Sequence, residues 1–202
     1  MLIGIKVEDY IKYMKDSLHI AFSGACCVGK TTLINILSEE YKDFTIQRES
    51  VRYLKDKYGL DFRSGDTGLQ MALLHLQTKF LMSSGKYLLD RTSLDSLAYS
   101  RWYKAQGNSD IPSNVFAYME EESKKNLIER VDLVIFLRPE IPLIADGTRI
   151  VDKEYQLGTD KIMEDIIKEC GIENKVIQPH GTPIERALFC KKYIDELIAK
   201  RS

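Results

Sequence analysis

The residues from 24 to 32 form the segment whose types and spacing are most suited to chemistry. They match the pattern GxxxxGK[ST], in which glycines let successive backbone N–H groups point into one concave cradle for phosphate. We therefore predict a nucleotide-phosphate site in which Lys30 reaches the β- and γ-phosphates and the Thr31 hydroxyl serves Mg²⁺. The predicted phosphate-binding residues are Gly24, Ala25, Cys26, Cys27, Val28, Gly29, Lys30, Thr31 and Thr32.

Asp90 and Arg91 form a second candidate group, directly after an apolar run. A magnesium-dependent phosphate site needs a carboxylate on a strand beside the phosphate loop. A second apolar run, 133–137, ends at Arg138 and offers no acid. We therefore predict that Asp90 holds magnesium-bound water. Arg91 has two interpretations: it touches phosphate or braces the site, or it forms a structural ion pair near the sheet edge.

Glu49 follows a third short apolar segment. Ligands of doubly wound sheets bind at the carboxyl ends of the strands, so Glu49, Asp90 and the phosphate loop are expected to converge on one crevice. A carboxylate in that crevice can accept a proton from an attacking hydroxyl. The alternatives are that Glu49 orients the acceptor or caps the helix expected from Ser50.

Arg149 lies in a long polar segment that includes Asp146 and Gly147. A segment of this kind suits a lid loop, at about 143–160, that brings a cation to the transferring phosphate and excludes water. An ordinary solvated loop is the competing interpretation. The sequence leaves both open.

The elements that position these residues alternate along the chain. Short apolar runs predict strands at 18–23, 44–48, 87–90, 133–137 and 175–178. Helical spacing predicts helices at 31–41, 50–57, 67–84, 94–103, 114–129 and 160–170, and a last helix that Thr182, Pro183 and Glu185 initiate. This alternation predicts an α/β fold with three layers and a mostly parallel sheet of about five strands.

The composition of the chain fits one ordinary domain. Its 202 residues are 44% hydrophobic and 29% charged, with a formal net charge of -1. These values exclude disordered, collagen-like and disulfide-stapled chains, and they show no basic excess of the kind that dedicated nucleic-acid binders carry. The four cysteines lack zinc spacing, and no apolar run is long enough to cross a membrane. We expect a cytoplasmic protein without membrane contact.

Together these segments resemble the nicotinamide riboside kinase-like family of P-loop kinases, which is also described as AAA-type. The resemblance covers about residues 18–198. It is carried by the phosphate loop, by Glu-Ser-Val-Arg at 49–52, by Leu-Leu-Asp-Arg-Thr at 88–92, by the run from Val131 through Asp146-Gly147-Thr148-Arg149, and by Gly-Thr-Pro-Ile-Glu-Arg at 181–186.

The resemblance implies a P-loop NTPase fold of the nucleoside- and nucleotide-kinase type that uses ATP and Mg²⁺. It implies that Glu49 and Asp90 are catalytic or acceptor-orienting carboxylates and that Arg149 acts as part of a lid loop. We expect a kinase domain at 18–202 behind a short helical extension at 1–17, with a nucleoside or nucleotide acceptor. A hydroxyl of DNA and a regulatory P-loop ATPase without a small acceptor stay open as alternatives. The aromatic residues Tyr53, Tyr99, Trp102, Tyr103 and Tyr118 either stack a base or belong to the core or the rim.

Overall fold

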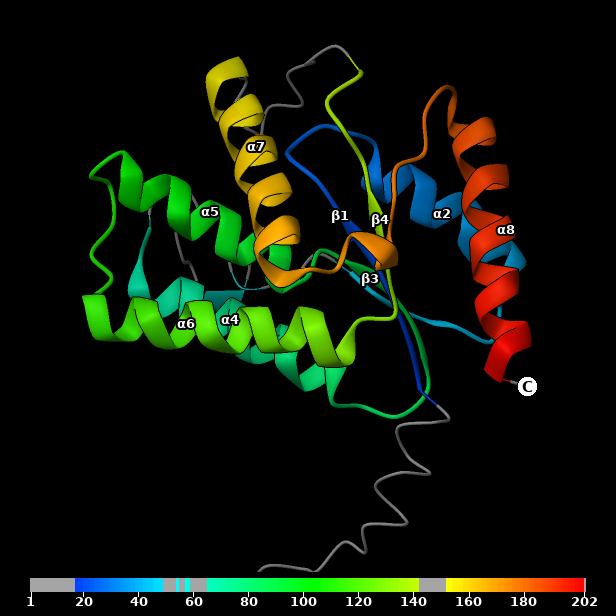
Figure 1. The fold of residues 1–202 in the computed structure, drawn as a ribbon, viewed down its shortest axis with the longest axis horizontal. Helices are drawn as coiled ribbons and strands as arrows, with labels where there is room; N and C mark the ends of the chain where they lie inside the picture. The colour runs from blue at the N-terminus through cyan, green and yellow to red at the C-terminus, as the bar shows by residue number, and fades with distance from the viewer. Residues whose placement is uncertain (1–16, 49–53, 55–56, 59–64, 142–151, 202) are drawn as a thin grey trace, which may run out of the picture.

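The computed structural model describes residues 17–48, 54, 57–58, 65–141 and 152–201. In Figure 1 a central sheet stands between two groups of helices. The predicted N-terminal helix, most of the predicted helix at 50–57 and the first half of the predicted lid loop fall outside the described residues. Among the described residues, no helix has the length and apolar character needed to cross a bilayer.

The sheet has five parallel strands. They are β1 (Leu18–Ser23), β2 (Thr45–Gln47), β3 (Lys86–Asp90), β4 (Leu133–Phe136) and β5 (Val176–Ile177), and their spatial order is β2-β3-β1-β4-β5. The central strand β1 pairs Ile20 with Leu88 on one side and Phe22 with Ile135 on the other. All pairs are parallel, so the strands end at the same edge of the sheet. The phosphate loop and Asp90 therefore meet at that edge.

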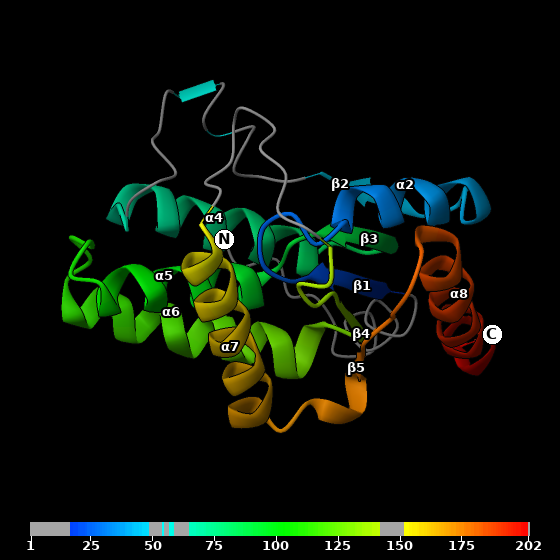
Figure 2. The same ribbon diagram turned by 90° about the horizontal axis from the view of Figure 1, so that it is seen from above.

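Eight further elements complete the described chain. They are α2 (Lys30–Glu40), α4 (Thr67–Leu81), α5 (Ser93–Ala105), α6 (Ser113–Lys125), the π-helical turn η1 (Asn126–Arg130), α7 (Lys153–Cys170), the 3₁₀ turn η2 (Glu173–Lys175) and α8 (Pro183–Arg201). Helices α2 and α8 cover one face of the sheet, and α4 to α7 lie on the other side, as Figure 2 shows from above. The predicted three-layer α/β fold is confirmed.

The alternation of side chains along β1 explains how residues of this strand are buried on both faces of the sheet. Successive side chains of a strand point to opposite faces, so Ile20 and Phe22 pack toward α2 and α8 while Ala21 packs toward α5 and α7. All six residues of β1 are buried. Burial on both faces is typical of a central strand in a parallel sheet that helices cover on each side.

Some predicted boundaries differ from the observed ones. The helix predicted at 160–170 begins at Lys153, because the Asp152 carboxylate caps it by accepting hydrogen bonds from the backbone N–H groups of Glu154 and Tyr155 at 2.8 and 3.1 Å. The loop predicted to reach about residue 160 therefore gives way to helix at 153. The helix predicted to run to residue 84 ends at Leu81. The capping box of α8 forms as expected, with Thr182 and Glu185 exchanging hydrogen bonds.

Candidate active site

The phosphate loop connects β1 to α2 at the carboxyl edge of the sheet. Its curvature depends on three positive φ angles: 146° at Gly24, 58° at Cys27 and 91° at Gly29. A Cβ atom on Gly24 would lie 2.4 Å from the carbonyl oxygen of Leu137, so only glycine fits where the loop passes the end of β4. The loop then leads into the N-terminus of α2, which adds the positive end of a helix dipole.

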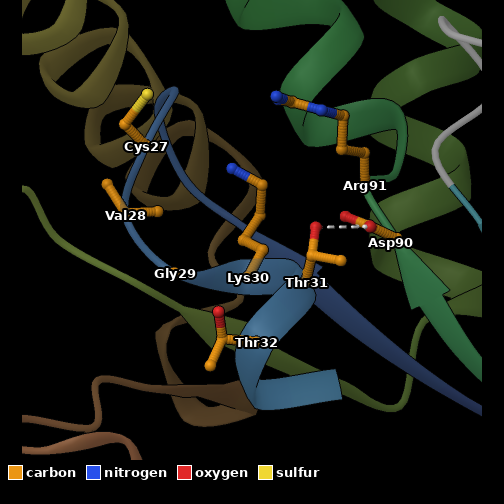
Figure 3. Close-up of a pocket in the computed structure, with 8 residues that line it drawn as sticks. All are labelled: Cys27, Val28, Gly29, Lys30, Thr31, Thr32, Asp90 and Arg91. Carbon is orange, nitrogen blue, oxygen red and sulfur yellow. Dashed lines mark hydrogen bonds between the residues drawn. The ribbon is translucent and has the colours of Figure 1, made fainter. Parts of the chain in front are cut away.

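This loop forms one wall of a pocket of ≈ 210 Å³. Asp90 and Arg91, at the end of β3, form the opposite wall, so two segments far apart in sequence meet here (Figure 3). The lining residues are Cys27, Val28, Gly29, Lys30, Thr31, Thr32, Asp90 and Arg91. A pocket with backbone N–H groups, two cations and one carboxylate has the chemistry of a phosphate-binding site.

Lys30 is buried in the loop, with 6% of its surface exposed. Its ammonium donates hydrogen bonds of 2.6 Å to the carbonyl oxygens of Gly24 and Ala25. A buried ammonium needs such partners, because burying a charge without them is costly. In this position the charge is already held inside the curve of the loop.

Thr31 and Asp90 bring two oxygens together across the pocket. The Thr31 hydroxyl donates to Oδ2 of Asp90 at 3.3 Å, as the dashed line in Figure 3 marks, and Asp90 is 3% exposed. A hydroxyl beside a carboxylate is a hard-oxygen donor set that suits Mg²⁺, which proteins hold with few side chains and with substrate phosphates. The described residues contain no cluster of three or more His, Cys, Asp or Glu side chains that could hold a metal by themselves.

Arg91 is held in a strained backbone conformation, with φ 78°. Its NH1 group donates to Oδ1 of Asp95 at 3.2 Å and to the hydroxyl of Tyr99 at 3.1 Å. Asp95 also accepts from the backbone N–H groups of Thr92, at 3.1 Å, and Gly24, at 3.4 Å. Both interpretations of Arg91 are thus compatible with the contacts, since it forms an ion pair and also lines the phosphate pocket.

Two more side chains hold the outer side of the phosphate loop. Gln156 of α7, which is fully buried, donates to the carbonyl oxygen of Cys26 at 2.8 Å. Arg186 of α8 donates to the carbonyl oxygen of Val28 at 3.1 Å. With Asp95 on the Gly24 N–H group, three helices fix the backbone of the loop.

Arg186 also contacts the segments that follow β4 and β5, and so connects them to the phosphate loop. Its guanidinium, 4% exposed, donates to the Gly181 carbonyl oxygen at 2.9 Å and to Glu140 at 2.8 Å, and Glu140 also contacts His180. Burial by itself would raise the pKa of the Glu140 carboxyl, but the hydrogen bond and charge of His180 and the Arg186 guanidinium lower it below its ordinary value. Glu140 therefore stays ionised and holds Arg186 against the loop.

Replacing Arg186 with glutamine is expected to weaken ATP binding about tenfold, because one charge-assisted hydrogen bond to the loop backbone is worth about 1.5 kcal/mol. Calorimetric titration with a non-hydrolysable ATP analogue measures this. Arg101→Gln is the matched control, since Arg101 pairs with Glu120 and Glu169 and does not contact the loop. Equal affinity in the Arg186 variant and the control would contradict the expectation.

The structure therefore places the predicted phosphate loop, Asp90 and Arg91 around one pocket. Glu49 and Arg149 lie outside the described residues, so their roles stay predictions. Sequence reasoning missed Asp95, Gln156 and Arg186 as supports of the loop. The spacing of Thr92 and Asp95 is that of a capping box, which could have indicated Asp95. No local pattern indicates Gln156.

A search of curated proteins finds no match to this chain. Solved structures with a similar fold include NadR protein in complex with NR, at 19% sequence identity and a TM-score of 0.65, covering 84% of this chain and 47% of that one. Deoxyadenosine kinase from M. mycoides is 17% identical with a TM-score of 0.67, covering 89% of this chain and 100% of its own. Thymidylate kinase from Candida albicans is 13% identical with a TM-score of 0.63, covering 93% and 94%.

These likenesses show the fold, and this chain spans about half the length of NadR. The P-loop fold expected from the sequence is thereby confirmed. A family model described as an AAA domain matches residues 19–186, a stretch that includes the phosphate loop, Asp90, Arg91 and Arg186. The chain belongs to this AAA domain family and has the fold of P-loop nucleoside and nucleotide kinases.

Proposed function

We propose that the protein is a kinase that uses ATP and Mg²⁺ to phosphorylate a nucleoside or nucleotide. The observation that carries the proposal is the pocket in which Lys30 and Thr31 of the phosphate loop face Asp90 and Arg91. A P-loop that only binds a nucleotide needs the first two residues. The cation that faces them from β3 gives a second phosphate-binding wall, as transfer between two substrates requires.

Catalysis in this proposal consists of positioning and charge stabilisation. The N–H groups of the loop and the N-terminus of α2 bind the β- and γ-phosphates, and the Lys30 ammonium turns from its carbonyl partners to the phosphate oxygens. Arg91, held by Asp95 and Tyr99, neutralises charge on the transferring group from the other wall. Glu49 orients the acceptor or accepts its proton.

Thr31 and Asp90 would hold Mg²⁺ in this scheme, Thr31 by its hydroxyl and Asp90 through bound water. The ion would supply positive charge that stabilises the phosphate oxygens. The two protein oxygens are already adjacent at 3.3 Å, so the site needs little rearrangement. Asp90 is buried, which strengthens its electrostatic interactions, whereas Thr31 is exposed to solvent.

Structures with this fold support the acceptor class. NadR has been solved in complex with NR, and deoxyadenosine kinase with dCMP and dCDP bound. For this protein we propose the acceptor class that these ligands share. It is a ribosyl or deoxyribosyl compound whose hydroxyl or phosphate accepts the γ-phosphate.

ADP release with ATP, Mg²⁺ and a panel of nucleosides, their 5′-monophosphates, DNA with free hydroxyl ends and hydroxymethylated DNA tests the proposal. At least one small acceptor is expected to raise ADP release well above the rate with ATP alone. Stimulation by DNA only, falling steeply with salt, would indicate the polynucleotide alternative. No stimulation by any acceptor would overturn the kinase function.

Glu49→Gln separates a kinase from a regulatory nucleotide-binding module. In a kinase this variant loses acceptor-dependent turnover and keeps its affinity for ATP. In a regulatory module the same substitution leaves both the slow hydrolysis and the affinity unchanged.

A further inference from the structure

A second pocket, of ≈ 270 Å³, lies between the end of α5 and the start of α7. Its aromatic lining consists of Trp102, Tyr103 and Tyr155, and its charged lining consists of the carboxylates Asp152 and Glu154. Two side-chain amides complete it, and none of the described residues that line it is a lysine or an arginine. The pocket thus offers ring faces and negative charge, a combination that favours planar groups with N–H donors.

The aromatic walls are fixed by packing. Tyr155 lies edge to face with Trp102, with centroids 5.9 Å apart, and its hydroxyl is 3.1 Å from that of Tyr103. Burial raises the pKa of Tyr155, so its hydroxyl keeps its proton. A Cβ atom at Gly158 would lie 1.8 Å from the Trp102 ring, so a glycine inside α7 makes room for the indole.

One tyrosine connects this pocket to the phosphate site. Tyr155 stacks on Tyr99 with centroids 5.6 Å apart and planes at 22°. Tyr99 accepts a hydrogen bond from Arg91, whose guanidinium carbon is 5.3 Å from the Tyr99 ring centroid. The Tyr99 side chain thus connects Tyr155, which lines this pocket, to Arg91, which lines the phosphate pocket. A nucleoside has the same layout, with its reacting hydroxyl and its base at opposite ends of one sugar.

We infer that this second pocket, the α5–α7 pocket, receives the base of the acceptor and selects bases that carry an exocyclic amino group. The inference rests on the kinase function proposed above and names the acceptor class for it. The carboxylate of Glu154 accepts a hydrogen bond from an amino group. It repels the carbonyl oxygen that replaces the amino group in uracil or hypoxanthine.

Trp102 is the only tryptophan of the chain, so its fluorescence reports on this pocket directly. The experiment titrates the full-length protein, without ATP, with cytidine and uridine and with adenosine and inosine. Within each pair the amino group is exchanged for a carbonyl. Excitation at the red edge of indole absorption, with free N-acetyltryptophanamide as reference, corrects for absorption by the nucleosides.

The amino nucleoside of each pair is expected to change the Trp102 signal at roughly tenfold lower concentration than its partner, the discrimination of one hydrogen bond to a charged group. Glu154→Gln is expected to reduce that preference to about twofold, because an amide can serve donor and acceptor alike. Asp165→Asn, on an exposed part of α7 paired with Lys161, is the matched control and keeps the preference. Equal responses within both pairs, or no response, would overturn the inference.

Turnover separates this inference from the kinase function. With ATP and Mg²⁺, the amino preference is expected in KM, with kcat similar within a pair. If no acceptor is phosphorylated but the Trp102 response keeps its amino preference, the base pocket stands and the kinase function fails. If acceptors are phosphorylated and neither the Trp102 signal nor Glu154→Gln follows the amino group, the kinase function stands and the inference fails.

Discussion

Replacing Lys30 with methionine is expected to lower kcat/KM for phosphoryl transfer by about a thousandfold. The ammonium is the one cation that projects from within the phosphate loop, where it is already desolvated and surrounded by carbonyl dipoles. A preorganised charge in a buried site contributes far more than one in water, and loss of a single such donor costs on the order of 10²–10³ in rate. Methionine keeps the length and apolar stem of lysine.

Steady-state rates with saturating ATP and the best acceptor of the panel measure this loss, and thermal unfolding checks that the variant is folded. Lys42→Met is the matched control, because Lys42 follows the same helix but is exposed and forms a surface ion pair with Glu39. A Lys30 variant that keeps a tenth or more of the activity would place the chemistry elsewhere.

The second large effect is expected for Asp90→Asn. The substitution keeps the shape of the side chain and the partner of Thr31 but removes a negative charge beside the phosphate pocket. If Asp90 helps to hold Mg²⁺, activity at millimolar Mg²⁺ should fall about a hundredfold, and the concentration for half-maximal rate should rise. Affinity for ATP without Mg²⁺ should stay the same or increase, since the phosphates lose a repulsive neighbour.

Initial rates as a function of Mg²⁺ concentration at fixed ATP measure the effect. Asp43→Asn is the control, because Asp43 pairs with Lys86 at the opposite end of β3 and is exposed. A parallel drop in maximal rate with an unchanged Mg²⁺ dependence would argue against a role in holding the ion. That outcome would instead make Asp90 a residue that orients the acceptor.

The sheet could be predicted from the sequence because its strands are short apolar runs with turn residues at their ends. Leu18–Ser23 and the β3 and β4 segments were recognisable by this local signal, which does not depend on distant contacts. The start of α7 could not be recognised from the sequence, because Gly158 is typical of a loop. The reason for a glycine at this position of the helix is the Trp102 ring, which packs against it from a distant part of the chain.

The candidate site likewise contains residues that could be predicted from local motifs and residues that could not. The phosphate loop, Asp90 and Arg91 follow motifs whose residues are close in sequence, and the structure brings them to one pocket. The supports of the loop depend on contacts with distant helices: Gln156 reaches Cys26, and Arg186 reaches Val28. A single sequence carries no periodicity that reports such contacts, so they appear only once the helices are placed.

The central position of β1 has a consequence for how the protein comes to its native state. The strand begins at Leu18, but one of its neighbours begins at Lys86 and the other at Leu133. Pairing such distant segments requires long loops to close before the strands gain stabilising contacts. This requirement slows folding. The phosphate loop is therefore expected to reach its final shape only after β4 has been synthesised and has paired with β1, and ATP has no assembled site to bind before then.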